Sequence, residues 1–250
     1  MRVARLRTLA ARAAWTAAAT PADSSASADR LRVEYDRLLA RSSMSDADSF
    51  ALVPVTVPIP AGRLVTVEIA AFRLGRTVVT NREYGVFLAG GRAAPPPWWN
   101  DPHFSAPLQP VVGVTWDEAT AYCAWLSDLT RLAWRLPTEA EWELAASGGL
   151  SAPRTPWGDA IPRGEIPEGA ISGPWEAGRG TPNGYGLLDP GTFVHEWCLD
   201  SHEPPGGGPR RRASRGGSWR HAIRWSSPSA RSSLPPDYRY SDYGFRVLRG

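Results

Sequence analysis

The stretch from Ser151 to Ser214 constrains the fold most, because it holds no long periodic element. One short apolar run, "TFVHEWCLD", interrupts it and predicts a β-strand over residues 192–200. The 250-residue chain also contains 12 Trp, 24 Gly and 24 Pro. This pattern favours an α+β fold in which much of the chain is ordered loop packed by Trp and Pro, and it argues against a helical bundle.

Three helices are predicted from capping residues and glycine stops. They cover residues 80–91, 115–130 and 138–149. Thr115 caps the second helix, and Thr138 caps the third. The buried face of the second helix is predicted to be Trp116, Ala119, Cys123 and Leu126. The alternating residues 51–76 predict a β-rich segment before the first helix.

The first 50 residues are expected to be an appendage. The stretch "TPADSSASAD" has the composition of a flexible linker, and residues 28–42 have apolar side chains at helical spacing. We therefore divide the chain into an appendage at 1–50 and one domain at 55–250. Arg12 interrupts any apolar signal core, so the expected location is cytoplasmic.

Seven stretches together resemble the formylglycine-generating enzyme, or sulfatase-modifying-factor, family. They are "RTVVTNREYGVFL", "PVVGVTWDEATAYCAWLS", "RLPTEAEWELAASGG", "PWGD", "NGYGLLDPGTFVHEWCLD", "RRASRGGSWRH" and "YGFRV". They occur in the family's order and cover roughly residues 55–250. The resemblance implies a single domain related to the C-type-lectin fold, with short helices, twisted β-hairpins and much irregular loop.

The residues that the founding enzymes use for catalysis are missing. The resemblance places a copper-binding cysteine pair just after the "GGS" turn, but this chain reads "RHAIRWSSPSARSS" there. Thiolates suit Cu(I) because both are soft. Cys123 and Cys198 lie in scaffold motifs and cannot be carried over as the pair, although a single disulfide between them is possible. We therefore expect no formylglycine-forming chemistry.

The resemblance also suggests a calcium site, the one cofactor for which candidate ligands remain. Family members commonly carry Asn and Trp where this chain has Phe193 and His195. Glu196 is retained, and Asn183 and Asp189 could still supply oxygens. Calcium needs several oxygen ligands at once, and these three residues are the candidate ligands.

Histidines offer a different metal site. His103, His195, His202 and His221 are spread through the sequence, and three of them could converge on a metal. Iron-dependent sulfoxide synthases of the superfamily do this, but they take their His ligands largely from an additional helical domain. A hydrogen-bonded structural role for His195 is the competing interpretation.

A ligand-binding face is predicted in the loops that surround the C-terminal motifs. "GGSW" and "GFRV" are interpreted as core, with Arg246 paired to a buried acid, and the residues between them are less constrained. Aromatic and basic side chains suit recognition. The candidate residues are Trp98, Trp99, Arg220, His221, Arg224, Trp225, Tyr238 and Tyr240.

Three functions remain open. The first is a ligand-binding or accessory module, with a small molecule or a protein as partner. The second is an oxidase or oxygenase that uses a His, Tyr or metal site, and the third is a variable protein of a diversity-generating retroelement. No run of 18 apolar residues predicts a membrane span. Residues 210–250 carry ten Arg against two acidic residues, but nucleic acid is not the expected partner.

Overall fold

The computed structural model describes residues 54–64, 67–165, 172–202 and 208–250. The predicted appendage at 1–50, with its helix at 28–42, lies outside the described residues. By their contacts, Val53–Arg82 and Pro96–Gly250 form one unit, and Glu83–Pro95 belong to another. All the candidate site residues belong to the larger unit.

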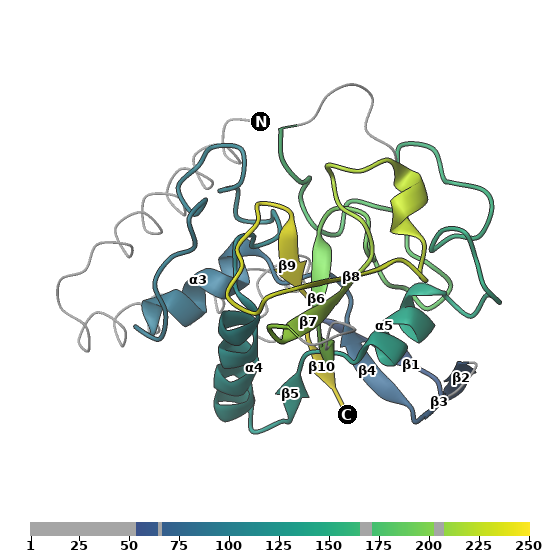
Figure 1. The fold of residues 1–250 in the computed structure, drawn as a ribbon, viewed down its shortest axis with the longest axis horizontal. Coiled ribbons are helices and arrows are strands. Elements are labelled where there is room, and N and C mark those ends of the chain that lie inside the picture. The colour runs from purple at the N-terminus through teal and green to yellow at the C-terminus, as the bar shows by residue number, and fades with distance from the viewer. Residues whose placement is uncertain (1–53, 65–66, 166–171, 203–207) are drawn as a thin grey trace, which may run out of the picture. The chain divides into compact units, whose positions relative to one another are not determined.

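One antiparallel sheet joins the beginning of the larger unit to its end (Figure 1). In order across the sheet, its strands are β1 (Thr56–Ile59), β4 (Phe72–Gly75), β10 (Leu248–Arg249) and β5 (Trp134–Arg135). A separate hairpin pairs β2 (Gly62–Leu64) with β3 (Val67–Ile69). The last strand, β10, thus lies between β4 from early in the unit and β5 from its middle, which ties the C-terminus into the scaffold.

A second sheet of four strands lies at the centre of Figure 1. In order it contains β8 (Arg231–Leu234), β7 (Arg211–Arg215), β6 (His195–His202) and β9 (Tyr243–Phe245). The strand predicted at 192–200 is confirmed as β6. It pairs antiparallel with β7, the next strand in the sequence, and parallel with the more distant β9, so β6 lies between them.

The three predicted helices are confirmed as α3 (Asn81–Ala89), α4 (Trp116–Thr130) and α5 (Glu139–Ala146). Thr115 and Thr138 each accept a hydrogen bond from the N3 backbone amide, and the Glu118 and Glu141 side chains each accept one from the cap amide. Such reciprocal capping satisfies amides that have no partner in the helix. The predicted inner face of α4 is buried, with Tyr122 added to it.

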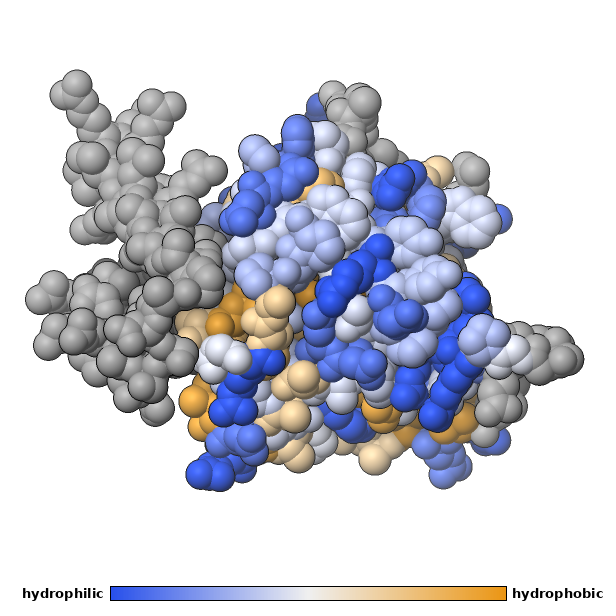
Figure 2. Space-filling model, turned by 60° about the vertical axis from the view of Figure 1, so that its left-hand side comes forward, coloured by the Kyte–Doolittle hydropathy of each residue, from blue (hydrophilic) through white to orange (hydrophobic). Residues whose placement is uncertain are grey.

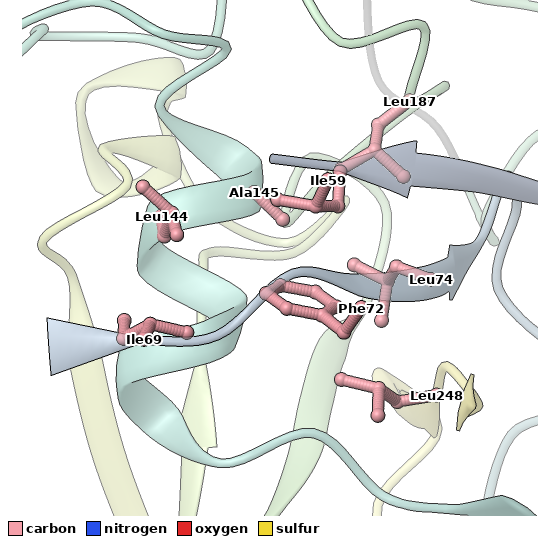
Figure 3. Close-up of a cluster of buried hydrophobic side chains, with 8 residues drawn as sticks. All are labelled: Ile59, Ile69, Phe72, Leu74, Leu144, Ala145, Leu187 and Leu248. Atoms are coloured by element: carbon pink, nitrogen blue, oxygen red, sulfur yellow. The ribbon is translucent and has the colours of Figure 1, made fainter. Parts of the chain in front are cut away.

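Helix α5 packs on the first sheet through apolar side chains (Figure 3). The buried residues of this cluster are Ile59, Ile69, Phe72, Leu74, Leu144, Ala145, Leu187 and Leu248. Burial of apolar surface is the main favourable term in folding. The cluster holds α5 in place, and α5 in turn carries Trp142 and Glu139 toward the second sheet.

The predicted pairing of Arg246 with a buried acid is confirmed, and the acid is Glu196. Arg246 donates through Nε and Nη2 to the two carboxylate oxygens at 3.0 and 3.1 Å, and both side chains are fully buried. The same guanidinium donates to three backbone carbonyls, those of Gly75, Arg76 and Leu188. The pair therefore links β6 to the first sheet with its hydrogen-bonding groups satisfied.

These elements confirm the α+β class with short helices, small sheets and much loop. Polar residues dominate the face drawn in Figure 2, with apolar residues gathered mainly along its lower part. Within the described ranges, no helix is long and apolar enough to cross a membrane.

A second ionic group fixes the start of α5 and gives a testable pH dependence. Glu139, 8% exposed, accepts hydrogen bonds from Arg231 at 3.0 and 2.8 Å and lies 2.8 Å from His202 Nε2. Burial raises the pKa of Glu139, but these hydrogen bonds outweigh it and hold the pKa below its ordinary 4.5. The ionised form therefore stabilises the fold above that pH, and the contribution is lost as the pH falls through the lowered value.

We expect Glu139→Gln to lower the free energy of unfolding by about 1–3 kcal/mol at pH 7, because the charged donors lose their anionic acceptor and one of its two oxygens. Urea denaturation should show the difference from wild type shrinking as the pH falls below 4.5. Glu176→Gln, at an exposed position, is the matched control and should change little. A deficit that is constant from pH 7 to pH 3 would show that charge at Glu139 is not the cause.

Candidate functional site

Strand register brings the candidate site together. His195, the first residue of β6, lies opposite Tyr243 in the parallel pairing with β9, and its amide donates to the Asp242 carbonyl at 2.8 Å. After β7 the chain returns beside the entry to β6, where the Trp219 amide donates to the Phe193 carbonyl at 2.9 Å. The loop after β7 and the residue before β9 therefore both adjoin His195.

The paired glycines of "GGSW" make this return possible. Gly216 has φ of +76°, and a Cβ built there would lie 2.3 Å from the Cα of Gly191. Only glycine adopts this conformation without strain and permits so close an approach. Gly217 then donates to the Gly191 carbonyl at 2.8 Å. The motif is structural, as predicted, and its role is to place Ser218 and His221 beside β6.

His195, His221 and Asp242 form a compact group. Each offers one ligand atom, and these atoms all lie within 4.8 Å of one another. His195 is 8% and Asp242 5% exposed, whereas His221 is at the surface. The two imidazole rings are 5.1 Å apart, centroid to centroid. Two members of the group are thus buried, and the third, His221, reaches the solvent.

His195 has a defined tautomer. Its Nδ1 lies 2.7 Å from the Gly216 carbonyl oxygen, which can only accept, so Nδ1 carries the proton and Nε2 keeps a lone pair. The Tyr243 ring packs against the imidazole at 4.8 Å. Burial lowers the pKa of His195, more than the charge of Asp242 raises it. The neutral ring therefore presents an unprotonated nitrogen.

Ser218 lies between the other two members. Its Oγ donates to Asp242 Oδ2 at 2.8 Å and lies 3.2 Å from His221 Nδ1. A hydroxyl has one proton, so when it is given to the carboxylate the serine oxygen accepts from His221 Nδ1–H. A nucleophilic triad requires the histidine between the serine and the acid. Here the serine is in the middle, which makes Ser218 an orienting residue and not a nucleophile.

The residues predicted to form a ligand-binding face are only partly at the surface. Trp225, Tyr238 and Tyr240 are 55%, 46% and 40% exposed. Arg220 is also exposed, with its guanidinium 5.7 Å from the Trp219 ring. The backbone of Arg224 lies in the 3-10 helix η2 (Ile223–Ser226), and its side chain is outside the described part.

The two tryptophans predicted for this face turn inward. Trp99 is 6% exposed, so its ring belongs to the interior. Trp98 is half-buried and packs on a cluster that includes Phe104 and Val194, with Trp219 on the same cluster. A surface ligand can therefore reach part of Trp98 but not the Trp99 ring, because the Pro-Trp-Trp loop uses its aromatics for packing.

The three candidate calcium ligands already accept hydrogen bonds from the protein. Asp189 accepts from the Gly178 and Gly180 amides at 2.6 and 3.0 Å, and burial raises its pKa to about 6. The Asn183 side-chain oxygen accepts from the amides of Tyr185 and Leu187 at 3.0 and 3.1 Å. A cation would compete with these backbone donors.

Of the three candidate ligands, Glu196 accepts the most hydrogen bonds. Besides Arg246, it accepts from Trp142 Nε1 at 2.7 Å and from the Gly191 amide at 3.0 Å. The negative charge of the Glu196 carboxylate is thus balanced by the buried guanidinium of Arg246. The calcium site stays a prediction, and the contacts favour a structural role for its candidate ligands.

Neither cysteine offers a thiolate for copper. Cys123 and Cys198 are free and buried. Burial raises the pKa of both thiols well above the ordinary value. Copper(I) in this family is expected on thiolates after the "GGS" turn, and the side chains placed there are His221 and Ser218. The residues present do not fit the family's copper site.

Sequence reasoning found part of the His-His-Asp group and missed the rest. His103 lies 3.1 Å from Asp101, and His202 lies beside Glu139, so two of the four histidines are elsewhere. Asp242 and Ser218 are not among the residues predicted for the site. Their positions in the sequence could have indicated them. Ser218 ends "GGS" and Asp242 immediately precedes "YGFRV", the two motifs interpreted as core.

The match to a family model shows that this chain is a sulfatase-modifying-factor domain. Residues 61–250 match the family model "Sulfatase-modifying factor enzyme 1-like domain", and the chain belongs to this family. It is 31% identical over 257 residues to the formylglycine-generating enzyme of Streptomyces coelicolor, covering 72% of this chain and 79% of that protein. It is 35% identical over 155 residues to the mouse inactive C-alpha-formylglycine-generating enzyme 2, covering 55% of this chain and 48% of that protein.

Two solved structures have a fold similar to that of this chain. CarF superposes with a TM-score of 0.65 at 21% identity, covering 80% of this chain and 99% of that chain. Treponema denticola variable protein 1 has a TM-score of 0.62 at 24% identity, covering 78% and 92%. At these identities the likeness concerns the fold, and function must be argued from the site.

Proposed function

We propose that this chain is a ligand-binding member of the sulfatase-modifying-factor family that does not convert cysteine to formylglycine. The proposed binding face is built by residues 218–242, which connect β7 to β9 and contribute the edge strand β8 on the way. Its ligand is a small molecule or an exposed protein segment. One of the relatives is described as inactive, so loss of the founding activity has a precedent in the family.

The observation that carries the proposal is the makeup of residues 218–242. They contain no cysteine, and they hold three of the large exposed aromatic side chains: Trp225, Tyr238 and Tyr240. Exposed aromatics give large contact area at low cost in conformational entropy. Tyr238 and Tyr240 also lie 6.2 Å apart, ring to ring, so they present neighbouring apolar surfaces on the same segment as the open side chain of His221.

A second candidate is an oxidase or oxygenase with a non-cysteine site. Its support is the group His195, His221 and Asp242, whose ligand atoms approach within 4.8 Å. This candidate shares the face with the first. The two candidate functions differ in whether the bound molecule is chemically converted.

The absence of formylglycine chemistry is directly testable. The protein is incubated with copper, oxygen and a peptide carrying Cys-x-Pro-x-Arg, and the peptide is analysed by mass spectrometry. We expect no conversion of the cysteine to the aldehyde, because Ser, His and Arg side chains do not replace a thiolate pair for Cu(I). The Streptomyces coelicolor enzyme, treated identically, is the positive control.

A double variant, Cys123→Ser with Cys198→Ser, removes every thiol of the chain. Aldehyde formation by the wild type alone would show that one of the buried cysteines reaches the substrate. Aldehyde formation by both proteins would show that a different group does the chemistry, and either result overturns the proposal.

A further inference from the structure

We infer that His195, His221 and Asp242 form a binding site for a divalent first-row transition metal, with iron(II) as the class that the ligand set fits. Two imidazoles and one carboxylate on one side of a metal are the ligands of non-haem iron(II) oxygenases. The inference goes beyond the proposed function, because a ligand-binding face does not require a metal.

The spacing of the group suits one ion. A metal with ligand distances of about 2.0–2.2 Å holds neighbouring ligand atoms about 3–4 Å apart. The three ligand atoms here all lie within 4.8 Å of one another without an ion. Binding must draw these atoms closer together, and His221 is the member at the surface, whereas the backbones of His195 and Asp242 are hydrogen-bonded to each other.

The surrounding hydrogen bonds are those of a metal site. Metal-bound histidines generally donate their second ring N–H to a carbonyl, a carboxylate or water, which fixes the ring and the tautomer. His195 does this through Nδ1 and the Gly216 carbonyl, leaving Nε2 for the metal. A histidine buried for packing alone also needs a partner, but it does not need a second histidine and a carboxylate beside it.

Ser218 completes the orientation of the other two ligands. Its hydroxyl engages Asp242 Oδ2, which leaves Oδ1 available, and its oxygen lies beside His221 Nδ1, which leaves Nε2 available. The Ser218 side chain thus orients both Asp242 and His221. The exposed side of His221 leaves coordination positions open to a small molecule arriving at the binding face.

A metal would occupy acceptor atoms of His195 and Asp242 other than those in the hydrogen bonds to Gly216 and Ser218. His195 and Asp242 are nearly buried, and buried polar groups are costly unless they are paired. The Asp242 carboxylate is the anionic member, and a divalent cation between it and two neutral imidazoles satisfies all three. No thiol takes part, so this site is chemically different from a thiolate copper site.

The test is an anaerobic titration of the metal-stripped full chain with Fe(II) by calorimetry, and with Co(II) by visible absorption. We expect one equivalent to bind, with the Co(II) spectrum showing nitrogen and oxygen ligands and no thiolate charge-transfer band. His221→Gln and Asp242→Asn should each weaken binding at least about 100-fold, since each removes a ligand. Ser218→Ala should weaken it about 10–100-fold, the usual effect of losing a partner of the ligands.

His221→Gln is the decisive variant for metal binding, because His221 is exposed and its replacement should leave the melting temperature unchanged. His103→Gln is the matched control, since His103 is an exposed histidine outside the group, and it should bind like the wild type. Failure of the wild type to bind either ion, or equal affinity of wild type and His221→Gln, overturns the inference. Neither result affects the formylglycine assay, so the two proposals fail separately.

Discussion

Glu196→Ala is expected to lower the free energy of unfolding by about 3–5 kcal/mol, because it leaves the Arg246 guanidinium buried without its carboxylate. Both side chains are fully buried, and Glu196 also satisfies Trp142 Nε1 and the Gly191 amide. Four donor groups on three residues would lose their acceptor at once. Urea denaturation at pH 7, followed by circular dichroism, gives the value.

The control is an ion pair at the surface. Asp101→Asn removes an exposed partner of His103 and should leave the free energy of unfolding nearly unchanged. If Glu196→Ala cost as little as Asp101→Asn, water or another acid would have to reach Arg246. That result would contradict the described burial of the pair and the link between the two sheets.

Trp142→Ala is expected to cost about 3–5 kcal/mol, as a large cavity in the core. Trp142 is 1% exposed and lies in a buried cluster with Ala146, Cys198 and Ala213. Trp142→Phe retains most of the packing and removes the hydrogen bond to Glu196, so its smaller cost measures that bond. A loss near zero for Trp142→Ala would show that α5 does not pack on β6 and β7.

Trp142 and Glu196 are in direct contact, so their effects should not add. Their side chains share the 2.7 Å hydrogen bond. Residues in one hydrogen-bond network typically couple by about 0.5–3 kcal/mol. A double-mutant cycle with Trp142→Phe and Glu196→Ala should therefore give a total smaller than the sum of the two. Strict additivity would indicate that the bond contributes nothing measurable.

Local structure was predictable wherever the signal was local. Thr115 and Thr138 stand at fixed distances from the acids of their capping boxes, so the starts of α4 and α5 follow from the sequence. The strand at β6 follows from its apolar run. The pairing of Arg246 with an acid was also predictable, because a buried guanidinium requires one. The identity of that acid, fifty residues away in sequence, was not.

The candidate site depends on non-local pairing and could be predicted only in part. His195 and His221 were visible as residues, but their meeting depends on the loop 216–219 lying beside residues 191–193. Asp242 joins them because β9 runs parallel to β6 in one particular register. A single sequence carries no signal for that register. The same limit led Trp99 to be assigned to a surface that it does not reach.

The central claim is that His195, His221 and Asp242 bind a metal ion and that no thiol takes part. Anomalous X-ray diffraction from crystals of the full chain equilibrated with Co(II), recorded at the cobalt edge, tests it most directly. The account predicts a peak within about 2.0–2.2 Å of His195 Nε2, His221 Nε2 and an oxygen of Asp242. A peak at Cys123 or Cys198, or no peak between the two histidines, would contradict it.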